Sequence, residues 1–260
     1  MHFRTVITDF CSFVYFVEVQ QIPDCSTVDI SGEIKEIVAV SQKNVYASFY
    51  EIPADLEVFY EEDIVKDPQE ILSISVATVK QAKVGLWHEI RGVRITSSIA
   101  HRIKTRSQRF LDLALSMLNN SFNGNASTEY GLQMESVARR KYEEMTQVPV
   151  IEVGVIISHA CPWLCSSPDG IVGKDGSYRL LEIKCPSSCA GKEIINQVTK
   201  TSNVPYLKFT DGKVALSETH CYYTQIQVSL FVLNLEECDF FVYISHDSVL
   251  LKGKFWPERK

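Results

Sequence analysis

The sequence predicts an α/β (α+β) fold in which a mixed β-sheet is flanked by helices. The 260-residue chain is 45% apolar, so it can bury a full core. From residue 71 onward the expected elements run helix, helix, strands, helix, strand, an order typical of a mixed sheet with helices on its faces. An apolar stretch of about 18 residues does not occur, which argues against a membrane span.

Residues 1–70 are expected to form an acidic N-terminal extension that is β-rich in part. They contain 4 Lys and Arg against 14 Asp and Glu, whereas residues 71–260 contain 22 against 18, so the two parts have net charges of −10 and +4. Short β-prone runs alternate with polar breaks in the extension. These runs are residues 5–7, 13–19, 36–40 and 45–50.

Residues 71–260 are expected to form one domain. A helix is expected over residues 74–80, and Thr96-Ser97-Ser98 offers an N-cap for a second helix through Ile99 and Ile103. A polar loop is expected over residues 119–128. Further helices are expected over residues 111–118, 129–145 and 219–233. Further strands are expected over residues 148–158, 170–172, 178–184, 240–245 and 249–255.

The chemical motif of the chain lies between residues 167 and 188. Asp169 stands in Ser-Pro-Asp-Gly, and a Gly-Lys-Asp-Gly turn separates it from the extended run Leu-Leu-Glu-Ile-Lys, which contains Glu182 and Lys184. Side chains two apart on a strand share a face, so Glu182 and Lys184 point the same way while Ile183 packs behind them. Two carboxylates beside an ammonium are the groups that a metal-dependent phosphodiesterase site needs.

Spacing alone also fits a structural interpretation, because Asp in Pro-Asp-Gly is usually a turn residue and a Glu-x-Lys pair is usually a solvated face. However, Leu180, Leu181 and Ile183 make the strand apolar, and a charged pair in a buried strand is costly unless it binds something.

Four segments in order resemble the lambda-exonuclease-like (YqaJ viral recombinase) branch of the PD-(D/E)XK nucleases. The first is Leu-Trp-His-Glu-Ile-Arg at 86–91 running into Ile-Thr-Ser-Ser at 95–98, with Ser97 in place of the usual Ala. The second is Gly-Leu-Gln-Met-Glu at 131–135. The third is the motif at 167–186, and the fourth is Tyr-Thr-Gln-Ile-Gln at 223–227. The resemblance implies a restriction-endonuclease-like core.

The resemblance also implies a metal site. Asp169, Glu182 and the Ile183 carbonyl would hold Mg²⁺, for which Mn²⁺ can substitute, and Lys184 would be the catalytic lysine. Glu135 would supply a further carboxylate for a second cation or its waters, although a surface helix glutamate is the alternative.

A second cluster is implied for the 5′ phosphate of a DNA end. Arg91 and Ser98, seven residues apart, match the family spacing, and Ser167 and Gln225 match further phosphate-contacting positions; a buried structural role is the alternative for Gln225. Trp87 is expected to be a core aromatic, with a base-stacking wedge as the alternative. A run of six basic residues without an acid would attract the DNA backbone, unless it is only a solvated helix face. This run comprises Arg91, Arg94, Arg102, Lys104, Arg106 and Arg109.

The resemblance therefore implies a Mg²⁺-dependent deoxyribonuclease, a 5′-to-3′ exonuclease on linear double-stranded DNA that acts in recombination or repair. A restriction-type endonuclease and a catalytically inactive DNA-binding domain are the alternatives. The implied partners are double-stranded DNA ends, a single-strand annealing protein and two further copies of the chain in a homotrimer. An intracellular location is expected, in the nucleus of a eukaryotic host and otherwise in the cytoplasm.

The eight cysteines include Cys161/Cys165 and Cys185/Cys189, at a spacing of four residues rather than the two common in zinc sites. Reduced, unligated thiols are expected, and a metal site near His159 is the alternative.

Overall fold

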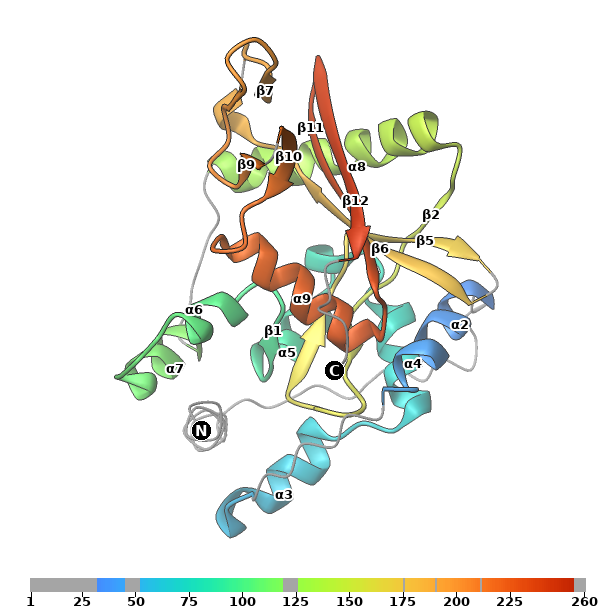
Figure 1. Ribbon diagram of the computed structural model, residues 1–260. Helices are drawn as coiled ribbons and strands as arrows, with labels where there is room; N and C mark the ends of the chain where they lie inside the picture. The colour runs from blue at the N-terminus through green and yellow to red at the C-terminus, as the bar shows by residue number, and fades with distance from the viewer. Residues whose placement is uncertain are drawn as a thin grey trace.

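A five-stranded mixed sheet forms the centre of the protein (Figure 1). The structure, a computed structural model, describes residues 32–44, 52–118, 126–174, 176–189, 191–210 and 212–254. The strand order is β12-β11-β6-β5-β2. The bounds are β2 (Val150–Ile151), β5 (Gly170–Lys174), β6 (Ser177–Lys184), β11 (Glu237–Ile244) and β12 (Asp247–Lys254). This arrangement confirms the expected fold class of a mixed β-sheet flanked by helices.

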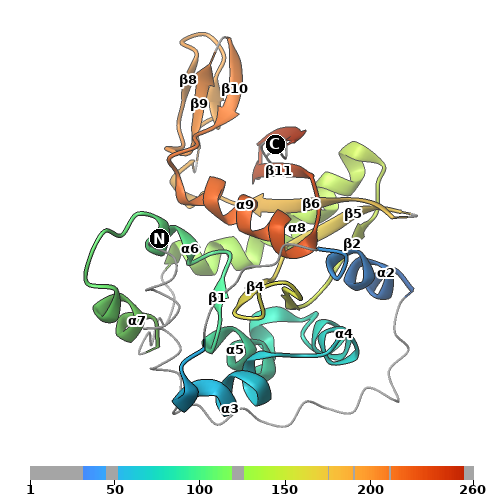
Figure 2. The same ribbon diagram turned by 60° about the horizontal axis from the view of Figure 1, so that its bottom comes forward.

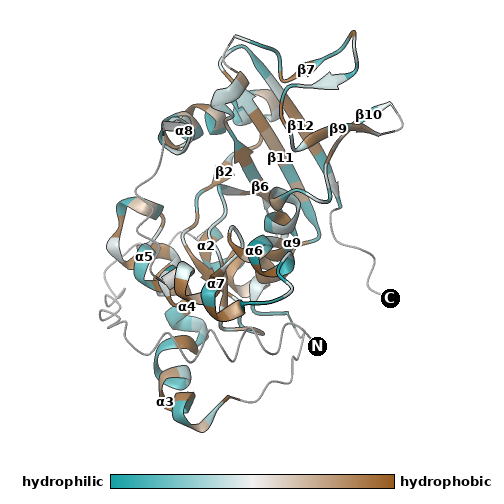
Figure 3. Cartoon of the chain, turned by 90° about the vertical axis from the view of Figure 1, so that its left-hand side faces the viewer, coloured by the Kyte–Doolittle hydropathy of each residue, from teal (hydrophilic) through white to brown (hydrophobic). Residues whose placement is uncertain are grey.

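Strand β6 lies in the middle of the sheet and pairs in both directions. It runs antiparallel to β5, with Gly170 opposite Leu181, and parallel to β11, with Phe240 opposite Glu182. The expected turn joins β5 to β6, and Gly173 and Gly176 have φ of 121° and 77° there, values that a residue with a Cβ rarely adopts. Apolar residues run along β11 beside it (Figure 3).

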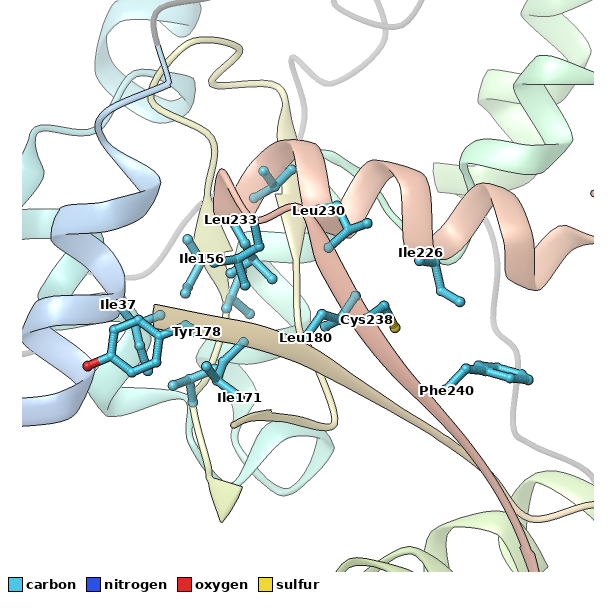
Figure 4. Packing of buried hydrophobic residues seen from close by; sticks show 14 of the residues in the cluster. Ile37, Ile156, Ile171, Tyr178, Leu180, Ile226, Leu230, Leu233, Cys238 and Phe240 are labelled. Carbon is cyan, nitrogen blue, oxygen red and sulfur yellow. The ribbon is translucent and has the colours of Figure 1, made fainter. Parts of the chain in front are cut away.

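Helices cover both faces of this sheet. Helix α9 (Cys221–Leu233) packs on one face, where Ile226, Leu230 and Leu233 meet Leu180 and other apolar strand residues (Figure 4). Helix α8 (Ala126–Thr146) packs on the other, where Ala138 and Tyr142 meet Leu181, Ile183 and Phe241. Because neighbours along a strand face opposite sides, Leu180 and Leu181 are buried in different clusters.

A second core lies beside the sheet. A three-stranded sheet of order β1-β4-β3 is surrounded by short helices, and its apolar cluster includes Ile95 and Trp163. The strands are β1 (Ile95–Thr96), β3 (Ile156–Ile157) and β4 (Leu164–Ser166). The helices that precede α8 in the chain are α2 (Gly32–Ser41), η3 (Ala54–Leu56), α3 (Glu57–Phe59), η4 (Tyr60–Ile64), α4 (Pro68–Ala77), η5 (Gln81–Lys83), α5 (Gly85–Gly92), α6 (Ala100–Lys104) and α7 (Phe110–Leu118).

Between β6 and α9 the chain leaves the body as an arm of two small hairpins (Figure 2). The arm follows the short helix η6 (Ser187–Cys189). Its strands are β7 (Ile195–Asn196), β8 (Thr201–Ser202), β9 (Leu207–Thr210) and β10 (Lys213–Leu216). These four strands were not among the expected elements.

Three local predictions were wrong. Residues 36–40 form part of helix α2 instead of a strand, because Ile34, Ile37, Val38 and Ser41 recur at helical spacing and are buried together. Thr96 does not cap a helix, since it pairs in strand β1, and α6 begins at Ala100 without a side-chain cap.

The strand expected over residues 148–158 is divided into β2 and β3, which belong to different sheets. Between them the Gly154 backbone N donates to the Ser75 carbonyl, and a Cβ at Gly154 would lie 2.2 Å from Thr78 Oγ1. The chain therefore crosses from one sheet to the other against helix α4, at a point where only glycine fits.

The acidic extension is described only from residue 32. The expected strands at 5–7, 13–19 and 45–50 lie outside the described residues. Ile34, Ile37 and Val38 share a core cluster with Ile71 and Ile74, and α4 begins at Pro68 after an Asp67 capping box. The division of the chain at residue 70 stays a prediction. Within the described ranges, no helix is long and apolar enough to cross a membrane.

Candidate active site

Strands β5 and β6 bring Asp169 beside Glu182. Continuing their antiparallel register by one residue places Asp169 opposite Glu182 at the end of the pair. Asp169 Oδ2 accepts a hydrogen bond of 2.7 Å from the Ile183 backbone N, which fixes the carboxylate at the strand end. Glu182 is 1% exposed and Asp169 is partly exposed, so one carboxylate lies at the base of the site and the other at its surface.

Lys184 and Gln225 both contact the buried carboxylate. Lys184 Nζ donates to Glu182 Oε1 at 2.5 Å, and Gln225 Nε2 from helix α9 donates to the same oxygen at 2.6 Å. Burial lowers the pKa of Lys184, but the charges of Glu182 and Asp169 outweigh it, so the pKa of this lysine is raised and the ammonium stays protonated. Lys184 is therefore a cation and a hydrogen-bond donor in this site.

Glu135 reaches the same site from helix α8. Burial and then the charge of Asp169 raise the pKa of Glu135 to about 7, although Arg139 NH2 binds its Oε1 at 2.8 Å. Burial and Asp169 also raise the pKa of Glu182 to about 7. The carboxylates of Glu135, Asp169 and Glu182 thus repel one another in a partly desolvated site, and a cation bound there would relieve this repulsion.

The donor set fits a hard divalent cation. Asp169, Glu182 and the Ile183 carbonyl offer oxygen atoms, and Mg²⁺ commonly takes one or two protein carboxylates and keeps several waters. In the part of the chain that the structure describes, no group of three or more His, Cys, Asp and Glu side chains is placed to hold a metal ion. An open site completed by a carbonyl and water agrees with both facts.

A cavity of about 540 Å³ opens beside these groups, and Glu135, Asp169, Ile183 and Lys184 line it. Helix α8 supplies one wall, the residues after β6 the floor, and the root of the arm together with the start of α9 the remaining wall. The other lining residues are Ser127, Thr128, Gly131, Leu132, Cys185, Pro186, Ser187, Ser188, Pro205, Tyr206, His220 and Tyr222.

Three of the four residues expected to bind a 5′ phosphate lie in a second cluster. Arg91 NH2 donates to Ser98 Oγ at 3.3 Å, and the Arg91 guanidinium lies 4.1 Å from the Trp87 ring centroid. Trp87 Nε1 donates to Ser167 Oγ at 2.9 Å. Gln225 is not in this cluster, because its side chain binds Glu182.

The Arg91 side chain has no acidic partner within this cluster. Burial lowers its pKa. Ser98 is exposed, and it shares a hydrogen bond of 2.9 Å with Thr96. A guanidinium held flat on an indole beside two hydroxyls is a suitable site for a phosphate group.

Arg94 does not belong to a basic surface stripe. It is 1% exposed, and its guanidinium donates to the carbonyls of Ile90, Pro162, Asp63 and Ile64. Burial lowers its pKa to about 10. Arg94 thus ties together three segments of the chain, namely residues 63–64, the end of α5 and the loop at Pro162. By contrast, Arg102, Lys104 and Arg109 are exposed, with Arg109 paired to Asp112 at 2.9 Å.

Tyr222, His220 and Tyr206 also line the cavity, although they were not among the expected site residues. Lys184 Nζ lies 4.7 Å from the Tyr222 ring centroid, so this ring helps to hold the ammonium. A signal for Tyr222 was present, because it lies three residues before Gln225 on the same helix and so shares a face with it. Tyr206 lies in the arm, and no pattern in the sequence placed it near the site.

All six cysteines within the described ranges are free, and Cys185 lines the cavity. Burial, followed by the charges of Asp169 and Glu135, raises the pKa of Cys185 to about 12. A thiol with such a pKa is a poor nucleophile near neutral pH, which agrees with a packing role.

Comparison with known proteins places these residues in a family. A model of the YqaJ-like viral recombinase domain matches residues 86–236, a span that contains every site residue named above. A relative from Acanthamoeba polyphaga mimivirus, the uncharacterized protein R354, is 30% identical over 127 residues. That match covers 46% of this chain and 20% of the relative, so the chain spans about a fifth of its length.

Two crystal structures of LHK-Exo, an alkaline exonuclease from Laribacter hongkongensis, are also similar. The complex with dAMP has a TM-score of 0.47 and 22% identity, covering 64% of this chain and 78% of that one. The other has a TM-score of 0.45 and 22% identity, covering 62% and 77%. On the match over residues 86–236, the chain belongs to the YqaJ-like viral recombinase domain family.

Proposed function

We propose that this protein is a Mg²⁺-dependent deoxyribonuclease that digests linear double-stranded DNA from a 5′ end, in recombination or repair. The observation that supports this most strongly is that Glu135, Asp169 and Lys184 line one cavity, while the buried Glu182 accepts a hydrogen bond from Lys184. Carboxylates around an open cation site, with a protonated lysine beside them, are the arrangement that phosphodiester hydrolysis requires.

Each group has a separate task in this proposal. Asp169, Glu182 and the Ile183 carbonyl hold the cation, which supplies Lewis acidity and a more acidic bound water. Lys184 orients the attacking water and offsets the negative charge that develops on the phosphoryl oxygens. Gln225 keeps Glu182 in place by its hydrogen bond, and Tyr222 keeps Lys184 in place.

Glu135 approaches from helix α8, opposite the strand carboxylates, and can hold the waters of the cation or a second cation. Its pairing with Arg139, which also binds Glu152 at 2.6 Å, positions the carboxylate without neutralising the site.

The end preference is assigned to Arg91, Ser98 and Ser167. Ser167 lies two residues before Asp169, so a strand whose 5′ phosphate binds this cluster also passes the cation site. Such a cluster has a use in an exonuclease, whereas an endonuclease would not need a contact to a terminal phosphate. A single-strand annealing partner and a homotrimer stay predictions from the family resemblance.

One experiment tests the function. Linear duplexes with 5′ phosphate or 5′ hydroxyl ends and a covalently closed circle are incubated with the protein, with Mg²⁺ or with EDTA. We expect Mg²⁺-dependent loss of the linear DNA, fastest with the 5′ phosphate, and an intact circle. Cleavage of the circle at the same rate would favour the endonuclease, and binding without cleavage in Mg²⁺ or Mn²⁺ would favour the inactive DNA-binding domain.

A further inference from the structure

The cavity has an aromatic wall, of which the reaction proposed above uses only Tyr222, as the ring beside Lys184. Tyr222 packs edge to face on Tyr206 and on His220, with ring centroids 5.0 Å and 4.6 Å apart, and the rings of Tyr206 and His220 are tilted against each other at 5.5 Å. All three residues line the cavity. We call them the aromatic wall.

Two rings of the aromatic wall, His220 and Tyr222, differ from ordinary core packing in their exposure, whereas Tyr206 is buried. Phe240 lies behind the wall, 6.0 Å from Tyr206 and 6.3 Å from Tyr222, and is fully buried. His220 and Tyr222, by contrast, are only half-buried and border the cavity. Aromatic rings that are fixed from behind and open in front can receive an apolar or planar ligand.

The wall also faces groups that suit the polar parts of a nucleotide. Lys184 lies over the Tyr222 ring at 4.7 Å, which places a cation for a phosphate beside the wall. Across the cavity, Ser127 and Ser187 share a hydrogen bond of 2.8 Å between their hydroxyls and offer polar atoms for a sugar. The cavity volume of about 540 Å³ lies in the range of roughly 300–1,000 Å³ that is usual for small-molecule sites.

We propose that this cavity is a nucleotide subsite in which the base of the nucleotide that carries the scissile phosphate packs on Tyr222 and His220. The inference rests on the proposed function for the identity of the ligand as a unit of a DNA strand. Arg91, Ser98 and Ser167 do not line the cavity, so the aromatic wall and the 5′-phosphate cluster bind different parts of the strand.

The decisive measurement compares dAMP with deoxyribose 5-phosphate, which lacks the base. Stacking of a base on an aromatic side chain contributes about 1–3 kcal/mol, so calorimetry with the native protein and Mg²⁺ should show roughly 5- to 150-fold tighter binding of dAMP. Tyr222→Leu removes the ring and should bring the two affinities together. Tyr222→Phe keeps the ring and should keep the preference.

Two further variants separate stacking from folding. His220 caps helix α9, since its Nδ1 accepts from the Tyr222 backbone N, and His220→Asn keeps a capping side chain while it removes the ring. We expect it to reduce the preference for dAMP. Tyr243→Leu removes a ring from strand β11 outside the cavity and should leave the preference unchanged.

Equal affinity of the native protein for both ligands would overturn the subsite, as would the absence of dAMP binding at millimolar concentration. A preference kept by both Tyr222→Leu and His220→Asn would overturn it too. Digestion of DNA is measured separately. A protein that prefers dAMP but never cleaves DNA would refute the nuclease and retain the subsite, whereas cleavage without a preference would refute the subsite alone.

Discussion

Replacing Glu182 with glutamine should remove both metal binding and a pH-dependent cost to stability. Glu182 is 1% exposed, and its pKa lies at about 7 against an ordinary 4.5 because of burial and then Asp169. A difference of this size corresponds to roughly 3 kcal/mol. In the absence of a cation, ionised Glu182 therefore destabilises the native protein by about that amount at high pH.

The direction of the pH dependence follows from proton binding. Between pH 4.5 and pH 7 the folded state keeps the Glu182 proton and the unfolded state has lost it, so stability falls as the pH rises through this window. Above pH 7 both states are ionised, and the lower stability remains. Lys184 keeps its proton throughout the window and does not change this sign. Glu182→Gln has no proton to lose, so its stability should fall by roughly 3 kcal/mol less between pH 4.5 and pH 8.

Urea unfolding in EDTA at a series of pH values measures the difference, with Glu218→Gln, an exposed glutamate ahead of α9, as the control. Added Mg²⁺ should stabilise the native protein, because the cation binds the folded state only, and should stabilise Glu182→Gln much less. DNA cleavage by the variant should be lost. Parallel pH curves for the native protein and the variant would refute the desolvation argument. Full cleavage by the variant would refute the assignment of Glu182 as a ligand.

Substitutions at three basic residues test the candidate active site, the 5′-phosphate cluster and the buried Arg94. Lys184→Met keeps an apolar stem against Tyr222 but lacks the ammonium. The rate of single-turnover cleavage should therefore fall by a factor of about 10² to 10⁴, with nearly unchanged DNA affinity. Weaker DNA binding with a normal cleavage rate would mean that Lys184 only contacts phosphate. Arg91→Ala should erase the preference for 5′-phosphate over 5′-hydroxyl ends, whereas Arg109→Ala, at an exposed position, should keep it. If Arg91→Ala kept the preference, the cluster could not be the binding site for the 5′ phosphate of the DNA end. Arg94→Leu should lower the free energy of unfolding by about 4 kcal/mol, since it leaves several buried carbonyls without a donor, and a change below about 1 kcal/mol would show that water replaces the guanidinium.

The central sheet and its catalytic strand were predictable from the sequence because their signals are local. The apolar run around Glu182 and the Gly-rich turn before it define a hairpin, and side-chain alternation then puts Glu182 and Lys184 on one face. The spacing of apolar residues likewise placed helix α8, which carries Glu135, and helix α9, which carries Gln225. Ordered motifs linked these elements to one family before any contact was known.

What the sequence by itself determined is therefore strands β5, β6, β11 and β12, helices α8 and α9, the family, and the charged residues Asp169, Glu182 and Lys184. The tertiary structure alone decided which distant groups meet them: Gln225 on Glu182 rather than on the 5′-phosphate cluster, Tyr222 and Tyr206 at the cavity, and Arg94 in the core rather than on a basic surface. The physical reason is that a side chain's type is fixed by its codon, whereas its burial and pKa depend on segments far away in the chain. Packing, and not spacing, made Arg94 a structural cation and brought the Tyr222 ring against the Lys184 ammonium.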